Sequence, residues 1–477
     1  MTRAARRPAA WVALPLLAAL LPIPAFAGEK AAAQGFQVPV LYHKLDNGLK
    51  VVLSPDATAP VAVVAVYYNI GFRIEPRDRT GFAHLFEHMM FQGSENLGKM
   101  EFIRLIQSNG GVMNGSTRFD FTNYFEIVPG NVLEMMLWGE ADRMRALDVS
   151  QENLTNQQGV VINEVKVNVL NQPYGGFPWL DVPQYANTNW YNAHNFYGDV
   201  ADIEAANLED VRGFFKTYYT PSNAVVVVAG DLDPDQTLGW IQKYFGAIPS
   251  GPKPKLPDIS EPRQEQEKRL TQPDKLATRP ALAVAYHVPK RNTPESYAMG
   301  LLDQILVQGR DSRLYQALVQ ERGFTGGVSG GINLLGNMFD IDGPTLWTTW
   351  LFHDADNSAD AILKSFDAEV EKLRAAPVDA ATLELAKVKM RSALYDSIED
   401  TFGFGRADLL ASFALFDDDP SRINQLEGEF MKVTPELLQA TAQEYLRPGN
   451  RTVLIIEPKA GEKPSAGGSE EPEGGAR

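Results

Sequence analysis

The residues with the clearest chemical meaning lie in the segment 81–91, which contains His84, Glu87 and His88 in the order His-x-x-Glu-His. On a helix, two imidazoles four residues apart project from one face and can bind the same metal ion. A carboxylate beside the second imidazole can poise a water molecule for attack. Because the chain has only six histidines, this spacing predicts a metal centre. The alternative is a surface helix whose polar face carries two histidines.

The same segment has the pattern of an amphipathic helix. Its apolar residues follow the i, i+3, i+4, i+7, i+8 spacing of a single helix face. These residues are Phe82, Leu85, Phe86, Met89 and Met90. We therefore expect this face to pack on a core, and the three polar residues to project from the opposite side.

The first 27 residues are typical of a secretory signal peptide. A basic stretch with Arg3, Arg6 and Arg7 precedes an apolar run over 11–21, and Ala25-Phe-Ala27 is a cleavage motif. We expect cleavage after Ala27 and a periplasmic or secreted mature chain, with a retained N-terminal anchor as the alternative. No later stretch reads as a membrane span.

Composition excludes several kinds of site and partner. The chain carries a net charge of −16 and has no cysteine. The acidic balance argues against nucleic acid or an anionic membrane surface as a partner. Without cysteine there can be no disulfide and no thiolate ligand, so a metal would have to be bound by His, Asp or Glu.

The length of 477 residues exceeds one usual core and predicts two domains. The segment 251–275, rich in proline and charge, predicts a linker between a domain at 38–250 and a second at 276–458. The last residues, 459–477, are rich in Gly, Glu, Pro and Ser, and predict a disordered tail.

The two halves also repeat each other. Residues 218–229 and 445–456 each show the end of a helix, a turn with proline, and a buried strand. Residues 63–68 also match 281–286, since each segment is a predicted strand followed by a helix. Hairpin signals such as Asn47-Gly48, mixed with helical periodicity, predict an α+β fold in which each half is a mainly antiparallel sheet covered by helices.

The same alignment of the two halves shows which residues of the second half correspond to the proposed site. Gly300, Asp303 and Gln304 stand where the first half has His84, Glu87 and His88. None of these three residues has an imidazole side chain, so they cannot replace the two histidine ligands. The second half is therefore predicted to be a structural repeat without a metal site.

With these features the chain resembles the pitrilysin, or insulinase, family of zinc metallopeptidases, whose His-x-x-Glu-His order is inverted relative to His-Glu-x-x-His. The resemblance spans roughly Tyr42–Pro458 and is strongest to short two-domain members similar to mitochondrial processing peptidase subunits and their bacterial relatives. It also rests on three segments: LDNGLKVVL at 45–53, GGVMNGSTRFDFTNYFEIVP at 110–129 and HNFYGDVADI at 194–203. The resemblance implies two homologous domains that face each other.

The resemblance further implies a set of site residues. Glu164 would be the third ligand of one Zn²⁺ per chain, beside His84 and His88, with Glu87 as the general base. Without the resemblance, Glu164 would be taken for a solvated helix carboxylate. Many relatives have a second carboxylate where this chain has Gln157, so we leave Gln157 out of the ligands.

Two other parts of the chain are compared with the same family. Asn114, Gly115 and Ser116 match the edge strand on which relatives hold peptides, so strand addition is expected there. The alternative is a glycine-rich hairpin without a ligand. His194 is expected to be a packing or loop histidine and not a fourth ligand.

One departure concerns the second half. Relatives often carry an Arg and, seven residues later, a Tyr that reach the substrate beside the zinc, whereas this chain has Val319 and Gly326 at those positions. Neither side chain can donate a hydrogen bond to a developing oxyanion. We therefore expect a homologous partner chain that supplies the pair in a heterodimer. A homodimer, or a monomer of low activity, is the alternative.

Together these observations predict a zinc-dependent endopeptidase that cleaves peptides or unfolded segments in the periplasm. One alternative is a non-catalytic scaffold or partner subunit of a peptidase complex. Another is metal-dependent chemistry on a non-peptide ligand, which the lack of a phosphate-binding loop in the sequence disfavours.

Overall fold

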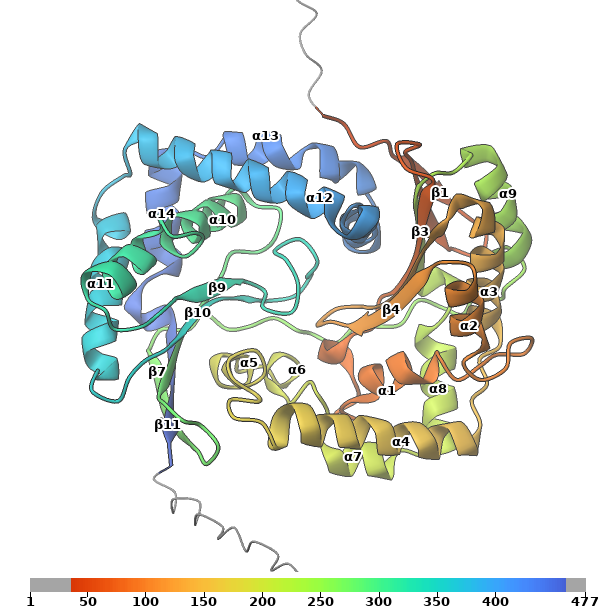
Figure 1. Ribbon diagram of the computed structural model, residues 1–477, viewed down its shortest axis with the longest axis horizontal. Helices are drawn as coiled ribbons and strands as arrows, with labels where there is room; N and C mark the ends of the chain where they lie inside the picture. The colour runs from red at the N-terminus through yellow and green to blue at the C-terminus, as the bar shows by residue number, and fades with distance from the viewer. Residues whose placement is uncertain (1–35, 460–477) are drawn as a thin grey trace, which may run out of the picture. The chain divides into compact units, whose positions relative to one another are not determined.

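The computed structural model describes residues 36–459 and contains two β-sheets with helices packed against them (Figure 1). This confirms the predicted α+β fold. The predicted signal peptide, 1–27, and the predicted tail beyond Lys459 lie outside the described residues. None of the helices within 36–459 has both the length and the hydropathy that a membrane span requires.

The first sheet has the strand order β1-β2-β6-β3-β5-β4, and the second has the order β7-β11-β8-β10-β9. The strands of the first sheet are β1 (Leu41–Lys44), β2 (Lys50–Pro55), β3 (Val61–Tyr68), β4 (Val112–Thr117), β5 (Thr122–Pro129) and β6 (Ala224–Gly230). Those of the second are β7 (Lys268–Asp274), β8 (Ala281–His287), β9 (Ser329–Ile332), β10 (Leu346–Phe352) and β11 (Arg451–Pro458). Both sheets are mainly antiparallel, with one parallel pair each, β2 with β6 and β7 with β11.

The helices of the first half are α1 (Phe82–Met89), α2 (Glu101–Ser108), α3 (Leu133–Arg145), α4 (Gln151–Val165), α5 (Asp181–Ala186), α6 (Trp190–Ala193), α7 (Val200–Ala205), α8 (Leu208–Tyr218) and α9 (Pro234–Phe245). The second half has α10 (Pro294–Leu306), α11 (Ala359–Ala375), α12 (Ala380–Asp417), α13 (Leu426–Met431) and α14 (Pro435–Tyr445). Segments of π-helix follow α4 at Lys166–Leu170 and occupy Tyr315–Glu321. The long α12 is interrupted by non-helical backbone from Asp400 to Gly403.

The two halves repeat one topology, as the sequence predicts. The order β7-β11-β8-β10-β9 matches β2-β6-β3-β5-β4 strand for strand, including the parallel pair. The asparagines that precede β6 and β11 also make the same contacts. Asn223 donates to the carbonyls of Tyr218 and Asn69, and Asn450 donates to those of Tyr445 and His287.

Both faces of the first sheet are buried. Alternate residues of a strand point to opposite faces, so Val64 and Val66 face α1 and α3 while Val63 and Ala65 face the other way. That second face packs against α12, which belongs to the second half, in a core that continues into the second sheet. In return α5 packs against β8 and β11. Each half therefore supplies a helix to the other half's sheet.

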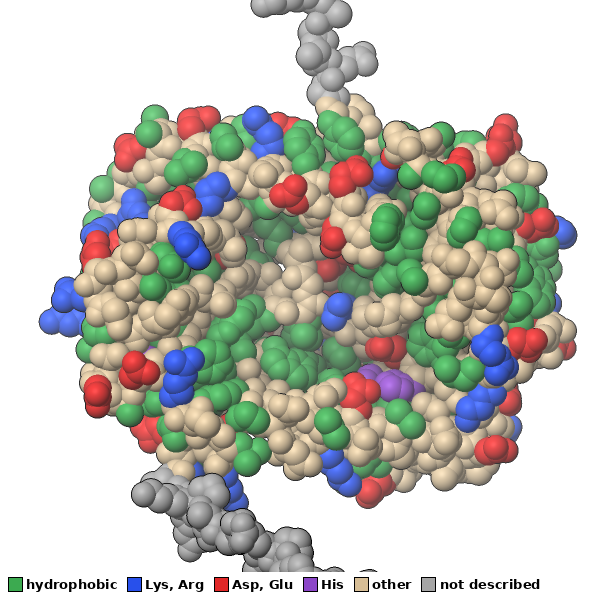
Figure 2. Space-filling model, in the orientation of Figure 1, with side chains coloured by type: hydrophobic (Ala, Val, Ile, Leu, Met, Phe, Trp, Pro, Cys, Tyr) green, Lys and Arg blue, Asp and Glu red, His purple; other side chains and the backbone are tan. Residues whose placement is uncertain are grey.

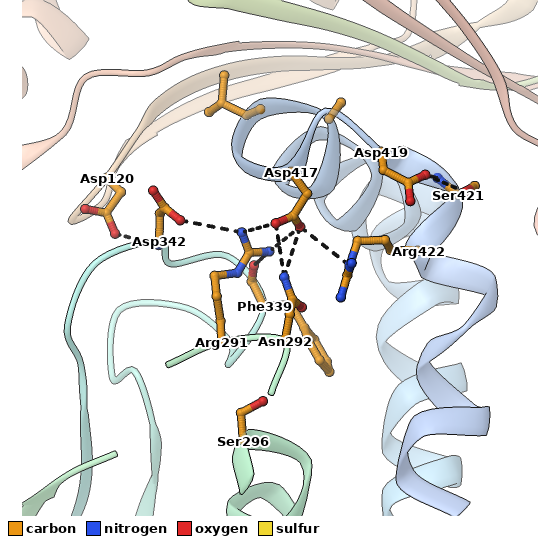
Figure 3. A network of polar contacts seen from close by, with 12 residues as sticks. Asp120, Arg291, Asn292, Ser296, Phe339, Asp342, Asp417, Asp419, Ser421 and Arg422 are labelled. Carbon is orange, nitrogen blue, oxygen red and sulfur yellow. Dashed lines mark hydrogen bonds and ion pairs between the residues drawn. The ribbon is translucent and has the colours of Figure 1, made fainter. Parts of the chain in front are cut away.

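Polar contacts at one end of α12 also join the two halves (Figure 3). Arg291 pairs with Asp417 at 3.1 Å and lies 3.9 Å from Asp342. The backbone N–H groups of Asp342 and Gly343 donate to Asp120 Oδ2, at 2.8 and 3.0 Å. Because Asp120 follows β4 in the first half, these bonds tie the end of the predicted peptide-binding strand to the second half.

The predicted linker, 251–275, is too long. Residues 251–267 contain no helix or strand, but Lys268–Asp274 form β7 at the edge of the second sheet. An edge strand needs partners on one side only and tolerates charged residues and proline. For this reason the polar, proline-containing sequence of β7 resembles that of a linker, although the segment is a strand.

Candidate metal centre

Helix α1 is held at its start by a buried carboxylate. Glu75 accepts hydrogen bonds from the backbone N–H groups of Gly81 at 2.9 Å and Ala83 at 2.6 Å. Burial raises the pKa of Glu75, while His194, 3.7 Å away, and the two N–H groups oppose the rise. Gly81 has a φ of 83°, which favours glycine, and closely approaches Gly198. The start of α1 therefore has one well-defined position.

The apolar face of α1 is buried as its sequence predicts, since all five of its apolar residues are at most 1% exposed. The remaining face carries His84, Glu87 and His88 toward α4, which lies beside α1 (Figure 1). Glu164 comes from the last turn of α4. Histidine side chains reach the surface in Figure 2, next to acidic side chains.

The structure brings His84, His88 and Glu164 together. The Nε2 atoms of the two histidines lie 3.3 Å apart. Glu164 Oε1 lies 3.5 Å from His84 Nε2, and Glu164 Oε2 lies 3.3 Å from His88 Nε2. Zinc bonds of about 2.0–2.1 Å at tetrahedral angles place ligand atoms about 3.3 Å apart. These three residues form the group of possible ligands found among the described residues. Their spacing fits a tetrahedral zinc ion.

The charges of this group are arranged for a cation. The hydrogen bonds of His84 and then His88 hold the pKa of Glu164 well below its usual range, against the opposing effect of burial. The Glu164 side chain is 31% exposed and that of His88 is 21% exposed. A carboxylate and two imidazoles therefore meet at a site that solvent can reach.

Glu87 lies on the same helix with its carboxylate oriented by a hydroxyl. Thr117, the last residue of β4, donates from Oγ1 to Glu87 Oε2 at 2.6 Å. This bond joins the predicted base to the predicted peptide-binding strand. Sequence reasoning stops at Ser116 and misses Thr117, although alternation along the strand turns Thr117 to the face opposite Ser116.

Tyr197 is a second residue that sequence reasoning misses. Its hydroxyl donates to Glu164 Oε1 at 2.7 Å, and its ring stacks on the His84 imidazole with a centroid distance of 5.0 Å. Burial raises the pKa of Tyr197 to about 12. The only signal for it in the sequence is its place within the segment 194–203.

Asn114, Gly115 and Ser116 lie in β4 at the edge of the first sheet, where β5 is the strand that pairs with β4 in the described part of the chain. The Asn114 side chain is exposed, and Gly115 is buried. Ser116 Oγ donates to Asn123 Oδ1 at 2.6 Å, so this hydroxyl is engaged within the sheet. The strand thus offers its outer backbone edge to a ligand.

Gln157 and His194 lie outside the group of possible ligands. Gln157 is buried in α4 and donates to Asn156 Oδ1 at 2.7 Å. His194 stacks on Trp190 at 4.3 Å and faces Glu75, so its place is behind the start of α1.

The matching place in the second half holds no such group among the described residues. Asp303 in α10 accepts hydrogen bonds from Trp347 Nε1 at 2.8 Å and Gln308 Nε2 at 3.0 Å, and burial raises its pKa to about 6. A Cβ atom on Gly300 would lie 3.0 Å from the sulfur of Met338. The space of the first histidine is therefore filled by a methionine.

Comparison with known proteins agrees with this division into halves. Residues 50–175 match a family model described as "Insulinase (Peptidase family M16)", and residues 205–390 match "Peptidase M16 inactive domain". The chain is 25% identical over 422 residues to "Zinc protease PqqE" of Helicobacter pylori, covering 87% of this chain and 92% of that protein.

Two solved structures share the fold. The crystal structure of a protease from Helicobacter pylori superposes with a TM-score of 0.81 at 24% identity, covering 89% of this chain and all of the other. The first half of the periplasmic protease PqqL from Escherichia coli gives a TM-score of 0.72 at 18% identity, covering 89% of this chain and 93% of the other.

Proposed function

Since the chain belongs to the insulinase family of peptidases, family M16, we propose that it is a zinc-dependent endopeptidase with His84, His88 and Glu164 as the zinc ligands. The observation that carries this proposal is the convergence of the three side chains: the two imidazole Nε2 atoms lie 3.3 Å apart, and each lies 3.3–3.5 Å from one oxygen of Glu164, a spacing that suits tetrahedral zinc. A zinc ion held by these three side chains would keep a fourth position for water or substrate. The name of the Helicobacter relative, a zinc protease, supports the choice of metal.

The side chains around this site have distinct roles in the proposed reaction. Zn²⁺, when bound, acts as a Lewis acid toward the scissile carbonyl and makes water a stronger nucleophile. Glu87 accepts a proton from the attacking water and returns it to the leaving amine. Because Thr117 donates to Oε2 of Glu87, the proton goes to Oε1.

The proposed substrate is an extended peptide or an unfolded segment in the periplasm. Strand β4 is the edge strand of the first sheet within residues 36–459 and can pair with an extended backbone. Thr117 ends this strand and contacts Glu87, so a peptide paired along β4 would run toward the base. Backbone pairing predicts weak dependence on side-chain sequence.

The main alternative is a non-catalytic scaffold. The match to an inactive peptidase domain covers the second half, where Gly300, Asp303 and Gln304 cannot replace the imidazole pair. The first half retains all four residues that hydrolysis would require. A scaffold would not need Glu87 to be oriented by Thr117, so we favour the enzyme.

Metal analysis combined with a cleavage assay tests this function. Wild-type protein should bind one zinc ion per chain and cleave a quenched, unstructured peptide, and a chelator should abolish the cleavage. Glu164→Gln should lose most of the zinc and the activity, whereas Glu152→Gln, on the exposed first turn of the same helix, should retain both. Full activity in Glu164→Gln would refute the ligand set.

A homologous partner chain is a separate proposal that rests on Val319 and Gly326. Val319 lies in the π-helical segment Tyr315–Glu321, and Gly326 follows it in an exposed turn. Neither can supply the hydrogen bonds expected of an Arg and a Tyr. Purification from the native host with mass spectrometry should identify a sister chain that carries this pair. A fully active preparation of this chain alone would refute the heterodimer.

A further inference from the structure

We infer that Tyr197 is a positioning residue that holds two of the three metal ligands, His84 and Glu164, in their binding geometry before metal arrives. The inference rests on the proposed function. Tyr197 itself lies outside α1 and α4, the helices that carry the three ligands.

The first observation is an unpartnered nitrogen. A metal-binding histidine usually donates its other ring N–H to a carboxylate or carbonyl, which fixes the orientation of the ring. His84 is 5% exposed, and its Nδ1 atom is buried without a hydrogen-bond partner. Some other contact must therefore orient this imidazole.

The ring of Tyr197 provides that contact. It stacks on the His84 imidazole at 5.0 Å, with 30° between the planes, and the Trp179 ring packs nearly perpendicular to the tyrosine ring, with 5.3 Å between the ring centroids. The imidazole thus rests on an aromatic ring that is itself held in place.

The hydroxyl of Tyr197 provides a second contact, to the other helix. It donates to Glu164 Oε1 at 2.7 Å. The same side chain therefore touches a ligand from α1 with its ring and a ligand from α4 with its hydroxyl. A bridge of this kind fixes the separation of the two ligands.

The backbone around Tyr197 is anchored to the start of α1. Gly198, with a φ of 94°, packs so closely on Gly81 that a Cβ atom at 198 would lie 2.6 Å from the Gly81 Cα atom. Next to it, the N–H of Asp199 donates to Thr80 Oγ1 at 3.0 Å. The loop that carries Tyr197 is thus fixed to the start of the helix that carries His84.

Two substitutions separate the two contacts. Tyr197→Phe keeps the ring on His84 and loses the bond to Glu164, whereas Tyr197→Leu loses both. Loss of a group that orients metal ligands weakens metal binding by about 10- to 100-fold. We expect a loss of about tenfold in zinc affinity for Tyr197→Phe and about 100-fold for Tyr197→Leu.

Tyr244→Phe is a matched control. The Tyr244 hydroxyl donates to Glu134 Oε1 at the same distance, 2.7 Å, outside the group of possible ligands. This substitution removes the same kind of hydrogen bond. It should leave zinc affinity unchanged.

The experiment is a competition titration of the full chain with Zn²⁺ against a chromophoric chelator, with thermal unfolding of each metal-free variant measured in parallel. We expect the order wild type, Tyr197→Phe, Tyr197→Leu in falling affinity. Excess zinc should restore most of the cleavage rate of Tyr197→Phe, with KM for the peptide unchanged. Equal zinc affinity in all three folded proteins would overturn the role of Tyr197 and leave the proposed function intact. A wild type that binds no zinc would overturn both.

Discussion

Arg143 offers a sharp test of how the core behind α1 is held. Its guanidinium is buried between the rings of Phe102 and Tyr124 and donates to the carbonyl of Met90. It also pairs with two fully buried carboxylates, Glu126 and Glu140. Burial, followed by the charge of Glu140, raises the pKa of Glu126 well above its usual value, and the charge of Arg143 opposes this rise.

Arg143→Met removes the only counter-charge recorded for this pair among the described residues. Without this counter-charge, a buried carboxylate must take up a proton in order to stay buried. Each such proton costs about 1.4 kcal/mol for every pH unit above the ordinary Glu pKa of about 4.3. The expected loss in free energy of unfolding is about 4 kcal/mol at pH 7 and about 1 kcal/mol at pH 5.

The sign follows from the direction of the shift. A buried acid with a raised pKa stabilises the folded chain at low pH, and this contribution is lost as the pH rises through the folded-state pKa. Urea denaturation at pH 5 and pH 7 measures the difference. Arg145→Met, a half-exposed arginine on the same helix that pairs with Asp142, is the control and should lose about 1 kcal/mol or less at either pH.

A double variant, Arg143→Met with Glu140→Met, removes the acid together with its partner and should recover most of the loss at pH 7. The reasoning fails if Arg143→Met is as stable as wild type, or if its loss is the same at both pH values.

Three further predictions follow from the site and its repeat. Thr117→Val removes the hydrogen bond to Glu87 and should lower kcat by about tenfold while leaving KM and zinc content unchanged, since hydrogen bonds to charged groups are worth about 1.5–3 kcal/mol. An unchanged kcat would mean that other contacts orient Glu87. Burial raises the pKa of Asp303 to about 6, so this residue stabilises the fold at low pH and the contribution is lost as the pH rises through 6. Asp303→Asn should therefore flatten the pH dependence of the free energy of unfolding by about 2 kcal/mol between pH 4 and 7. Gly300→His should not create a second zinc site, because Met338 fills the space and its sulfur would lie 3.0 Å from a Cβ atom at 300; metal analysis showing two zinc ions per chain would contradict this.

The sequence predicts the features of the fold that short-range patterns carry. The buried face of α1 follows from helical spacing, and Asn47-Gly48 does form the turn of a hairpin, with Gly48 at a φ of 88°. The repeat is predictable because residues 218–229 and 445–456 combine the same helix end, turn and strand. The exchange of α5 and α12 between the halves leaves no such local signal.

The parts of the site that sequence reasoning misses depend on distant segments. Thr117 reaches Glu87 from 30 residues away, and Tyr197 reaches Glu164 from 33 residues away. Neither residue type is diagnostic of a metal centre, so only the packing of β4 and of the 194–199 loop against α1 reveals them. Glu126 and Arg143 are also buried, although charged residues are almost never fully buried unless they are paired.

The central claim is that zinc at His84, His88 and Glu164, with Glu87 as the base, hydrolyses peptide bonds. Its most direct test is the rate at which zinc-loaded Glu87→Gln cleaves an unstructured quenched peptide, relative to wild type prepared in the same way with any copurifying partner. The account predicts one zinc ion per chain in both proteins and loss of cleavage in Glu87→Gln by at least about 100-fold. Cleavage by zinc-loaded Glu87→Gln at the wild-type rate would contradict it.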